Sequence, residues 1–240
     1  MPQDSAPSSV CDVGLAVVVL SKAPVPGRVK TRLTLGPGAL SPEAAAGVAA
    51  AMMRATLDRV SAHCGAAADR RFLAIDQPGL APRWAREAGW TVIDQGGGGL
   101  GDRIARAWER AWQGAAPGAV AFFGVDCPDV PAAALAAIAP ALVRADAAAG
   151  PVVDGGYWTL AAGRRRPELL RGIDWGTAAV YDQTRRAAAE AGLSLDALPA
   201  WHDVDRPDDL DALRNRVQTS SPHDPALARL KVDLARHAPG

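Results

Sequence analysis

Four cationic side chains crowd one short segment of this 240-residue sequence: Lys22, Arg28, Lys30 and Arg32. The segment, SKAPVPGRVKTRL, also contains two prolines and Gly27, which restrict the backbone where surface loops ordinarily stay free. A stiffened loop suits a phosphate, because backbone amides and side chains can wrap the anion without first being ordered. A solvated basic turn is the alternative. The loop is not a Walker-type P-loop, since Val29 stands where that motif requires glycine.

Two further segments supply glycines and a carboxylate. The run GGGGLG includes Gly99 and Gly101 and formally contains the G-x-G-x-x-G pattern of dinucleotide-binding proteins. A run of four glycines satisfies that pattern easily, so we favour a loop that approaches a base or phosphate and feeds a helix N-terminus. Asp126 follows the apolar run AFFGV, where a carboxylate is costly to bury unless it is paired or binds metal. An Asx turn or a helix cap is the alternative role for Asp126.

The first half of the chain alternates between strand and helix patterns. Short apolar runs predict strands over residues 14–20, 70–75, 90–94 and 118–125. Helical patterns follow over residues 41–60, which open with a Ser-Pro start signal, and over 82–89, 99–112 and 130–145. Four such repeats predict a three-layer α/β fold with a mainly parallel sheet, strand one lying near its middle. The cationic loop, the glycine run and Asp126 should then meet at the carboxyl edge of the sheet.

The second half follows another pattern. Residues 151–163 and 193–204 are predicted to be extended, whereas 176–192 and 206–217 are predicted to be helical. Two successive glycines beside flat aromatic rings predict that the motif DGGYW lines the acceptor side of the cleft, through Asp154, Gly155, Gly156 and Tyr157. An ordinary hairpin turn is the alternative. Trp175 and Thr177, in the motif WGT, are expected at the cleft mouth, and Thr177 is also expected to cap the following helix.

Composition limits the class of protein. The 26 Lys and Arg residues balance the 26 Asp and Glu residues, so no whole-protein field would attract nucleic acid or a membrane. Three cysteines without zinc-site spacing favour a reduced, cytoplasmic compartment, and no apolar run reaches the length of a membrane span. We expect a loose tail over residues 1–12, one domain over 13–217, and a linker with a helical tail over 218–240. Homodimerisation is left open.

The chain resembles the DUF2064 family in six motifs and in their order along the sequence. The motifs are SKAPVPGRVKTRL, GLGDRI, GVDCPDV, GPVVDGGYWTLA, WGT and DVDRPDDL. That family is linked with arsenosugar-biosynthesis glycosyltransferases and with GT-A folds, the Rossmann-related folds of nucleotide-diphospho-sugar transferases. The chain is also similar to phospholactate guanylyltransferases and to molybdenum-cofactor nucleotidyltransferases. The resemblance covers residues 14–216, and it implies a GT-A fold that binds a nucleotide.

The resemblance also implies roles for individual residues. The loop after strand one would hold a triphosphate, and Lys30, Arg28 and Asp126 would act in catalysis. The implied phosphate-binding residues are Ser21, Lys22, Gly27, Arg28, Lys30, Arg32, Gly99 and Gly101. Asp126 would hold Mg²⁺ or Mn²⁺, with Asp205 or Asp203 of DVDRPDDL completing the metal site. Arg206 departs from the family pattern, which carries threonine at that place.

The function predicted from these residues is nucleotidyl transfer. A small phosphorylated or phosphonate-like acceptor attacks the α-phosphorus of an NTP, and pyrophosphate leaves. Four cations suit a triphosphate better than a diphosphate. Glycosyl transfer from an NDP-sugar is the alternative, because it needs almost the same groups, and a non-catalytic nucleotide-binding protein is a third. We expect the loop cations and the metal carboxylates to lie on opposite walls of one cleft.

Overall fold

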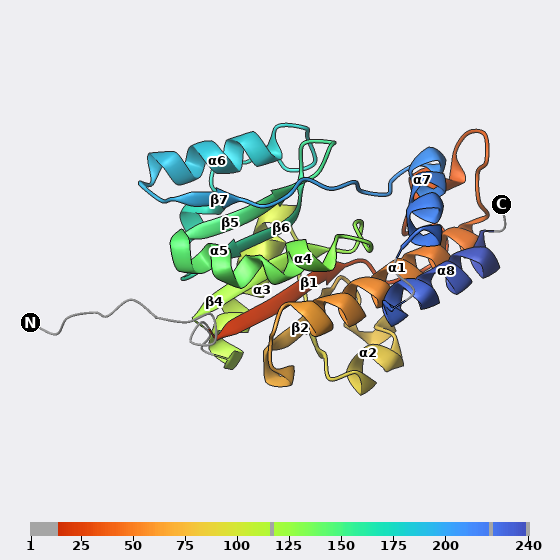
Figure 1. Ribbon diagram of the computed structural model, residues 1–240, viewed down its shortest axis with the longest axis horizontal. Helices are drawn as coiled ribbons and strands as arrows, with labels where there is room; N and C mark the ends of the chain where they lie inside the picture. The colour runs from red at the N-terminus through yellow and green to blue at the C-terminus, as the bar shows by residue number, and fades with distance from the viewer. Residues whose placement is uncertain (1–13, 116–117, 221–222, 239–240) are drawn as a thin grey trace, which may run out of the picture.

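The computed structural model describes residues 14–115, 118–220 and 223–238, and the tail expected over residues 1–12 lies outside them. A seven-stranded sheet runs in the order β3-β2-β1-β4-β6-β5-β7 (Figure 1). Neighbouring strands pair in parallel except at β6, which is antiparallel to both β4 and β5. The prediction of a mainly parallel α/β sheet with strand one near its middle is therefore confirmed.

The strands are β1 (Leu15–Ser21), β2 (Arg71–Ile75), β3 (Thr91–Asp94), β4 (Ala119–Gly124), β5 (Ala147–Pro151), β6 (Tyr157–Ala162) and β7 (Leu195–Ala197). The helices are α1 (Pro42–His63), α2 (Arg83–Glu87), α3 (Leu100–Ala115), α4 (Ala132–Ala136), α5 (Ile138–Arg144), α6 (Val180–Glu190), α7 (Pro207–Gln218) and α8 (Pro225–His237). Short 3-10 helices are η2 (Thr31–Thr34), η3 (Ala68–Arg70), η4 (Pro78–Leu80) and η5 (Pro167–Leu170).

Alternate side chains of β1 fill the two layers on either side of the sheet. Val17 and Val19 belong to the core shared with α1, α2, α4 and α5, whereas Ala16 and Val18 belong to the core shared with α3 and α6. All four side chains are fully buried. A strand buried on both faces reads as a continuous apolar run, which explains why β1 was recognisable from its sequence.

Helix α1 lies between the sheet and the C-terminal helices. Its start is the predicted one, since Ser41 Oγ accepts a 3.1 Å hydrogen bond from the backbone N–H of Ala44 and Pro42 is the first helical residue. Met53 of α1 packs toward the sheet, and Met52 packs against α7 and α8. Figure 1 shows α8 beside α1. Apolar residues surround much of α1 because two cores flank it.

Two local predictions need correction, and one strand was missed. The helix expected over 130–145 is two helices, because the Pro140 ring would clash with the carbonyl of Ala136, the last residue of α4. The helix expected from residue 176 begins at Val180, and Thr177 Oγ1 instead accepts from the N–H of Ala179 in the preceding turn, at 3.3 Å. Strand β5 was not predicted.

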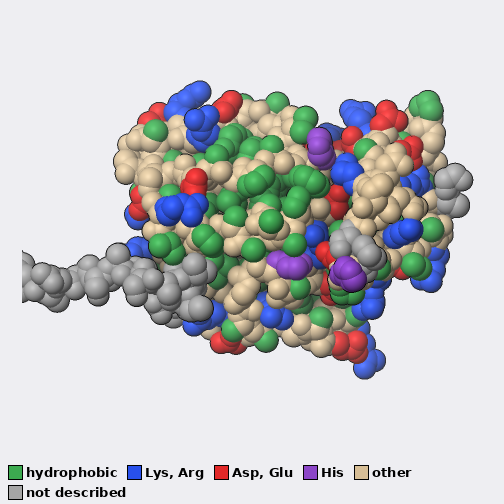
Figure 2. Space-filling view, viewed as in Figure 1, with side chains coloured by type: hydrophobic (Ala, Val, Ile, Leu, Met, Phe, Trp, Pro, Cys, Tyr) green, Lys and Arg blue, Asp and Glu red, His purple; other side chains and the backbone are tan. Residues whose placement is uncertain are grey.

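The surface over α4 and α5 is apolar but made of small side chains. Figure 2 shows hydrophobic side chains gathered in the middle of this face, over these two alanine-rich helices, where Val143 is 44% exposed. Within the described ranges, no helix has both the length and the apolar composition that crossing a membrane requires.

Candidate functional site

The carboxyl ends of β1 and β4 open into a cleft with a cavity volume of about 660 Å³. Its lining comes from the loops after β1, β3 and β4, from the β5–β6 turn, and from residues 175–180 and 203–205. Lining it are the predicted site residues Ser21, Lys22, Lys30, Arg32, Asp126, Asp154, Gly156, Tyr157, Trp175, Thr177, Asp203 and Asp205. Predicted site residues outside the lining are Gly27, Arg28, Gly99, Gly101 and Gly155. One volume of this size can hold a nucleotide and a small acceptor.

The loop after β1 is ordered by hydrogen bonds, one to Asp76 after β2 and one within the loop itself. The N–H of Ala23 donates to Asp76 Oδ1 at 2.7 Å, and the N–H of Arg28 donates to the carbonyl of Val25 at 3.0 Å. Gly27 has a φ of 73°, in the left-handed region that favours glycine. Lys22 is exposed and lines the cleft, whereas Arg28 is exposed outside its lining. The chain is thus stiffened here, as the prolines and glycine predicted.

Lys30 lies with its ammonium between the carboxylates of Asp126 and Asp205. Its Nζ lies 2.5 Å from Asp126 Oδ1 and 3.6 Å from Asp205 Oδ1, and its side chain is only 7% exposed. Burial alone would lower the pKa of Lys30, but the two carboxylates outweigh burial and raise this pKa above its ordinary value. Arg32 pairs with Asp205 Oδ2 at 2.7 Å. The expectation of cations and carboxylates on opposite walls is therefore wrong, because the two sets pair directly.

Carboxylates concentrate beside this pair. The pKa of Asp203 is raised to about 6, first by burial and then by neighbouring carboxylates, of which Asp154 has the largest effect. Burial, followed by nearby carboxylates including Asp126, raises the pKa of the Cys127 thiol well above its ordinary value. The thiol therefore stays protonated near neutral pH and is a poor nucleophile. This corner of the cleft is acidic and favours a cation.

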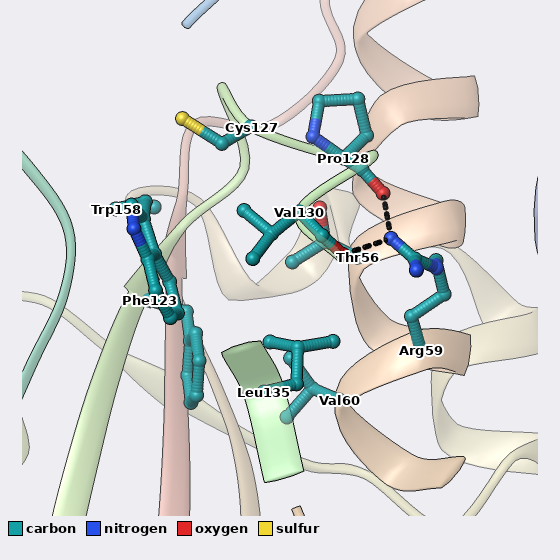
Figure 3. A pocket seen from close by; sticks show the side chains of 10 residues that line it. Thr56, Arg59, Val60, Phe123, Cys127, Pro128, Val130, Leu135 and Trp158 are labelled. Atoms are coloured by element: carbon teal, nitrogen blue, oxygen red, sulfur yellow. Dashed lines mark hydrogen bonds between the residues drawn. The ribbon is translucent and has the colours of Figure 1, made fainter. Parts of the chain in front are cut away.

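Buried contacts hold the loop that carries Asp126. Arg59 of α1 donates from Nη1 to the carbonyls of Pro128, at 3.2 Å, and Val130, at 2.6 Å (Figure 3). The N–H of Val204 donates to the carbonyl of Asp126 at 3.0 Å, which joins this loop to residues 203–205. Side chains of Phe123, Trp158 and others enclose a cavity of about 10 Å³ beside it. A cavity this small has room for about one water molecule, so it belongs to the scaffold.

Asp129, three residues beyond Asp126, is a buried structural carboxylate. It accepts from Arg216 Nε of α7 at 2.6 Å and from Trp201 Nε1 at 3.1 Å. The side chain of Asp129 is only 4% exposed. The two carboxylates of the DCPD segment thus have different environments, since Asp126 faces the cleft and Asp129 ties the loop to the C-terminal helices.

The glycine-rich loop after β3 is held by the first turn of α3. The N–H of Gly99 donates to Asp102 Oδ2 at 2.9 Å, and Arg103 Nε donates to the carbonyl of Gly98 at 3.1 Å. A β-carbon on Gly101 would lie 2.4 Å from Trp175 Nε1. Gly101 therefore makes room for an indole ring, and the residues of this segment that line the cleft are Leu100, Arg103 and Ile104.

The DGGYW and WGT motifs touch each other. A β-carbon on Gly155 would lie 2.0 Å from the carbonyl oxygen of Ala178, and the N–H of Tyr181 donates to the carbonyl of Gly155 at 2.9 Å. The rings of Tyr157 and Trp175 meet edge to face at 6.4 Å. Asp154 Oδ1 accepts from the N–H of Gly156 at 3.0 Å, as in a tight turn. The DGGYW motif thus forms a tight turn, as the alternative interpretation held. Asp154 and Gly156 of this turn also line the cleft.

Sequence reasoning missed Gln95 and Arg103. The buried Gln95 side chain donates to the carbonyls of Ser21 and Ala74, both at 2.7 Å, and so joins the ends of β1 and β2 beneath the cleft. Arg103 Nη1 lies 3.4 Å from Gln95 Oε1 and lines the cleft. Gln95 could have been found from its place directly after a predicted strand. A side-chain amide buried there needs hydrogen-bond partners from the neighbouring strands.

The carboxylates fit a hard divalent cation only in part. In the part of the chain that the structure describes, no three His, Cys, Asp or Glu side chains are placed together to hold a metal ion. Mg²⁺ is commonly held by one or two carboxylates together with substrate phosphates, and oxygen is its preferred donor. Asp126 and Asp205 already face one shared positive charge, the ammonium of Lys30. Their donor chemistry therefore fits a metal that a nucleotide helps to bind.

Comparison with solved structures places the fold in the class of nucleotide-diphospho-sugar transferase-like proteins. A protein of Desulfovibrio desulfuricans G20, provisionally named a nucleotide-diphospho-sugar transferase, is 29% identical, with a TM-score of 0.74 over 94% of this chain and 98% of that chain. The chain belongs to the family DUF2064, described as an uncharacterized protein conserved in bacteria, whose profile matches residues 51–177. No curated protein shows significant sequence similarity to the chain.

Two more distant structures share the fold alone. A cytidylyltransferase from Leptospira borgpetersenii serovar Hardjo-bovis is 10% identical, with a TM-score of 0.55 over 93% of this chain and 94% of that chain. A nucleotidyl transferase from Methanothermobacter thermautotroptrophicus is 16% identical, with a TM-score of 0.51 over 85% of this chain and 97% of that chain.

Proposed function

We propose that this protein is a divalent-metal-dependent transferase that binds the phosphates of a nucleotide and transfers a nucleotidyl group to a small acceptor, releasing pyrophosphate. The arrangement that carries the proposal is the Lys30 ammonium set against Asp126 and Asp205 where β1 and β4 end. Ligands of open α/β sheets bind in that crevice. The names of the two distant fold neighbours, a cytidylyltransferase and a nucleotidyl transferase, support nucleotidyl transfer.

Charge neutralisation and alignment are the catalytic tasks. Ser21, Lys22, Lys30 and Arg32 would contact the phosphates, with Gly27 shaping their loop and Arg28 reaching the outermost phosphate. Asp126, with Asp205 or Asp203, would hold Mg²⁺ or Mn²⁺, which when bound neutralises charge on the departing pyrophosphate. Gly99 and Gly101 would not touch the ligand but would shape the segment that brings Leu100, Arg103 and Ile104 to the cleft. The acceptor would lie against Asp154, Gly156, Tyr157, Trp175 and Thr177, with Gly155 shaping the turn that carries three of them.

Glycosyl transfer from an NDP-sugar is the second candidate. The part of the cleft lining contributed by residues 152–158, 175–180 and 203 includes Asp154 and Asp203 but no lysine or arginine. Such a lining suits a hydroxyl-bearing acceptor better than the phosphorylated acceptor predicted from the sequence. The provisional name of the Desulfovibrio desulfuricans protein, a nucleotide-diphospho-sugar transferase, also supports this candidate.

Two measurements test the proposal. Thermal unfolding with Mg²⁺ and each of the four common NTPs, or with UDP- and GDP-sugars, should identify a selective ligand, because stabilisation grows with occupancy. Phosphorus NMR with that ligand and a panel of phosphorylated and hydroxyl-bearing acceptors then separates the reactions, since nucleotidyl transfer releases pyrophosphate and glycosyl transfer releases an NDP. Stabilisation without turnover would favour a non-catalytic nucleotide-binding protein. No stabilisation by any nucleotide would overturn all three candidates.

A further inference from the structure

Lys30 is embedded among the groups proposed to bind metal. Besides its contacts with Asp126 and Asp205, its Nζ donates to the carbonyl of Val204 at 2.5 Å. The ammonium therefore has three oxygen partners from two chain segments, and its side chain is only 7% exposed. A positive charge already occupies the space between the two carboxylates.

The backbone at Lys30 has an unusual left-handed conformation, which indicates that the fold holds this residue in a defined place. Its φ is 48° and its ψ is 38°, and among the described residues no other non-glycine has a positive φ. The left-handed conformation is unfavourable for a residue with a side chain. The following 3-10 helix, η2, carries Leu33 into the fully buried core between α1 and the C-terminal helices. The tertiary structure thus holds Lys30 in this conformation despite its cost.

Building on the proposed function, we propose that Lys30 and the divalent metal are alternative partners of Asp126 and Asp205, and that nucleotide binding moves Lys30 from these carboxylates to phosphate oxygens. Two cations held at the same carboxylates would repel each other. The flexible four-carbon stem of lysine lets its charge move while the backbone stays in place. A nucleotide supplies new partners for Lys30 and at the same time exposes carboxylate oxygens.

This exchange predicts linked binding. In the free protein, Lys30 competes with the metal, so metal alone binds weakly. Nucleotide removes that competition, so each ligand strengthens the binding of the other by the same factor. Arg32 does not substitute for Lys30, because its side chain is 63% exposed and pairs with the opposite oxygen of Asp205, at 2.7 Å.

The test is Lys30→Met, with two titrations by calorimetry. Without nucleotide, Mn²⁺ should bind the variant about tenfold more tightly than the parent, because the competing charge is gone. Without metal, in EDTA, the NTP that stabilises the parent most should bind roughly ten- to a hundredfold more weakly, because a charge-assisted contact to phosphate is lost. Lys231→Met, an exposed site on α8 far along the chain, is the matched control and should change neither affinity.

The outcomes separate this inference from the function on which it rests. Weaker NTP binding with unchanged or weaker Mn²⁺ binding would overturn the exchange and leave the nucleotide site standing. Unchanged affinity for both ligands would overturn the exchange and the proposed role of Lys30 in phosphate binding. If Lys30→Met does not fold, Lys30→Gly removes the same charge while glycine adopts the left-handed backbone without strain, and the same two titrations decide.

Discussion

The Arg59 guanidinium in α1 and the Asp224 carboxylate at the start of α8 form an ion pair of 2.9 Å, with side chains that are 4% and 15% exposed. Arg59 also donates to two carbonyls of the loop that follows Asp126. One side chain therefore joins the C-terminal helix to the loop that carries the main candidate metal ligand. The pair makes α8 part of the support of the site, although α8 lines none of the cleft.

Breaking this ion pair should lower the free energy of unfolding. Asp224→Asn keeps an acceptor for the N–H groups of Ala226 and Leu227 but leaves the buried Arg59 charge uncompensated. We expect a loss of about 3 kcal/mol in the free energy of unfolding, measured by urea denaturation. Asp233→Asn in the same helix removes an exposed pair and should change stability by less than about 1 kcal/mol. Equal effects of the two substitutions would show that the Arg59 pair is unimportant.

Gly155→Ala should be strongly destabilising because there is no room for a β-carbon. The added atom would lie 2.0 Å from a backbone oxygen, and the φ of Gly155 is 92°. We expect a loss of about 3 kcal/mol or more, the sum of backbone strain and overpacking. Gly172→Ala is the control, because Gly172 also has a positive φ but nothing lies within 4 Å of the position that its new methyl group would take. If both variants lose the same stability in thermal or urea unfolding, the contact between Gly155 and Ala178 is not tight.

Stability should depend on the ionisation of Asp203. Its folded-state pKa of about 6 lies above the ordinary value of 3.8, so the ionised carboxylate destabilises the folded state. That cost is fully present above pH 6 and disappears as the pH falls toward 3.8. Asp203→Asn should therefore raise the melting temperature at pH 8 and have almost no effect at pH 4. Because the side chain is half-buried, we discount the gain to about 1 kcal/mol, or roughly 2–4 °C. The scans need EDTA, and a pH-independent gain would contradict the assignment.

Asp126→Asn should separate chemistry from binding. Losing this carboxylate should lower metal-dependent turnover by about a hundredfold or more, because charge on the leaving group is no longer neutralised. Nucleotide affinity without metal should stay the same or rise, since Lys30 loses its 2.5 Å partner and becomes available to phosphate. Steady-state kinetics and calorimetry in EDTA measure the two effects. Retained turnover would exclude Asp126 as a metal ligand.

The parallel part of the sheet could be predicted from residue patterns alone, and so could the segments that reach its carboxyl edge. Buried parallel strands such as β1 are local apolar runs, and the following helices start at local signals such as Ser41 and Pro42. The rule that ligands bind where such strands end then brings Lys30 and Asp126 to one cleft without further information. The cleft does contain both side chains.

Which of these groups touch each other could not be predicted in that way, because it depends on how distant segments pack. Strand β5 contains three successive alanines, which carry no strand pattern, and it forms because β6 and β7 flank it. The pairing of Lys30 with the segment around Val204 joins residues 174 positions apart, and no local rule specifies such a contact. Glycine at positions 101 and 155 suggested close contact with a ligand. Packing explains why these residues are glycine, because a β-carbon would collide with Trp175 at the first and with Ala178 at the second. Contacts between distant segments depend on how helices and turns pack, and a sequence pattern reports only the local geometry of each.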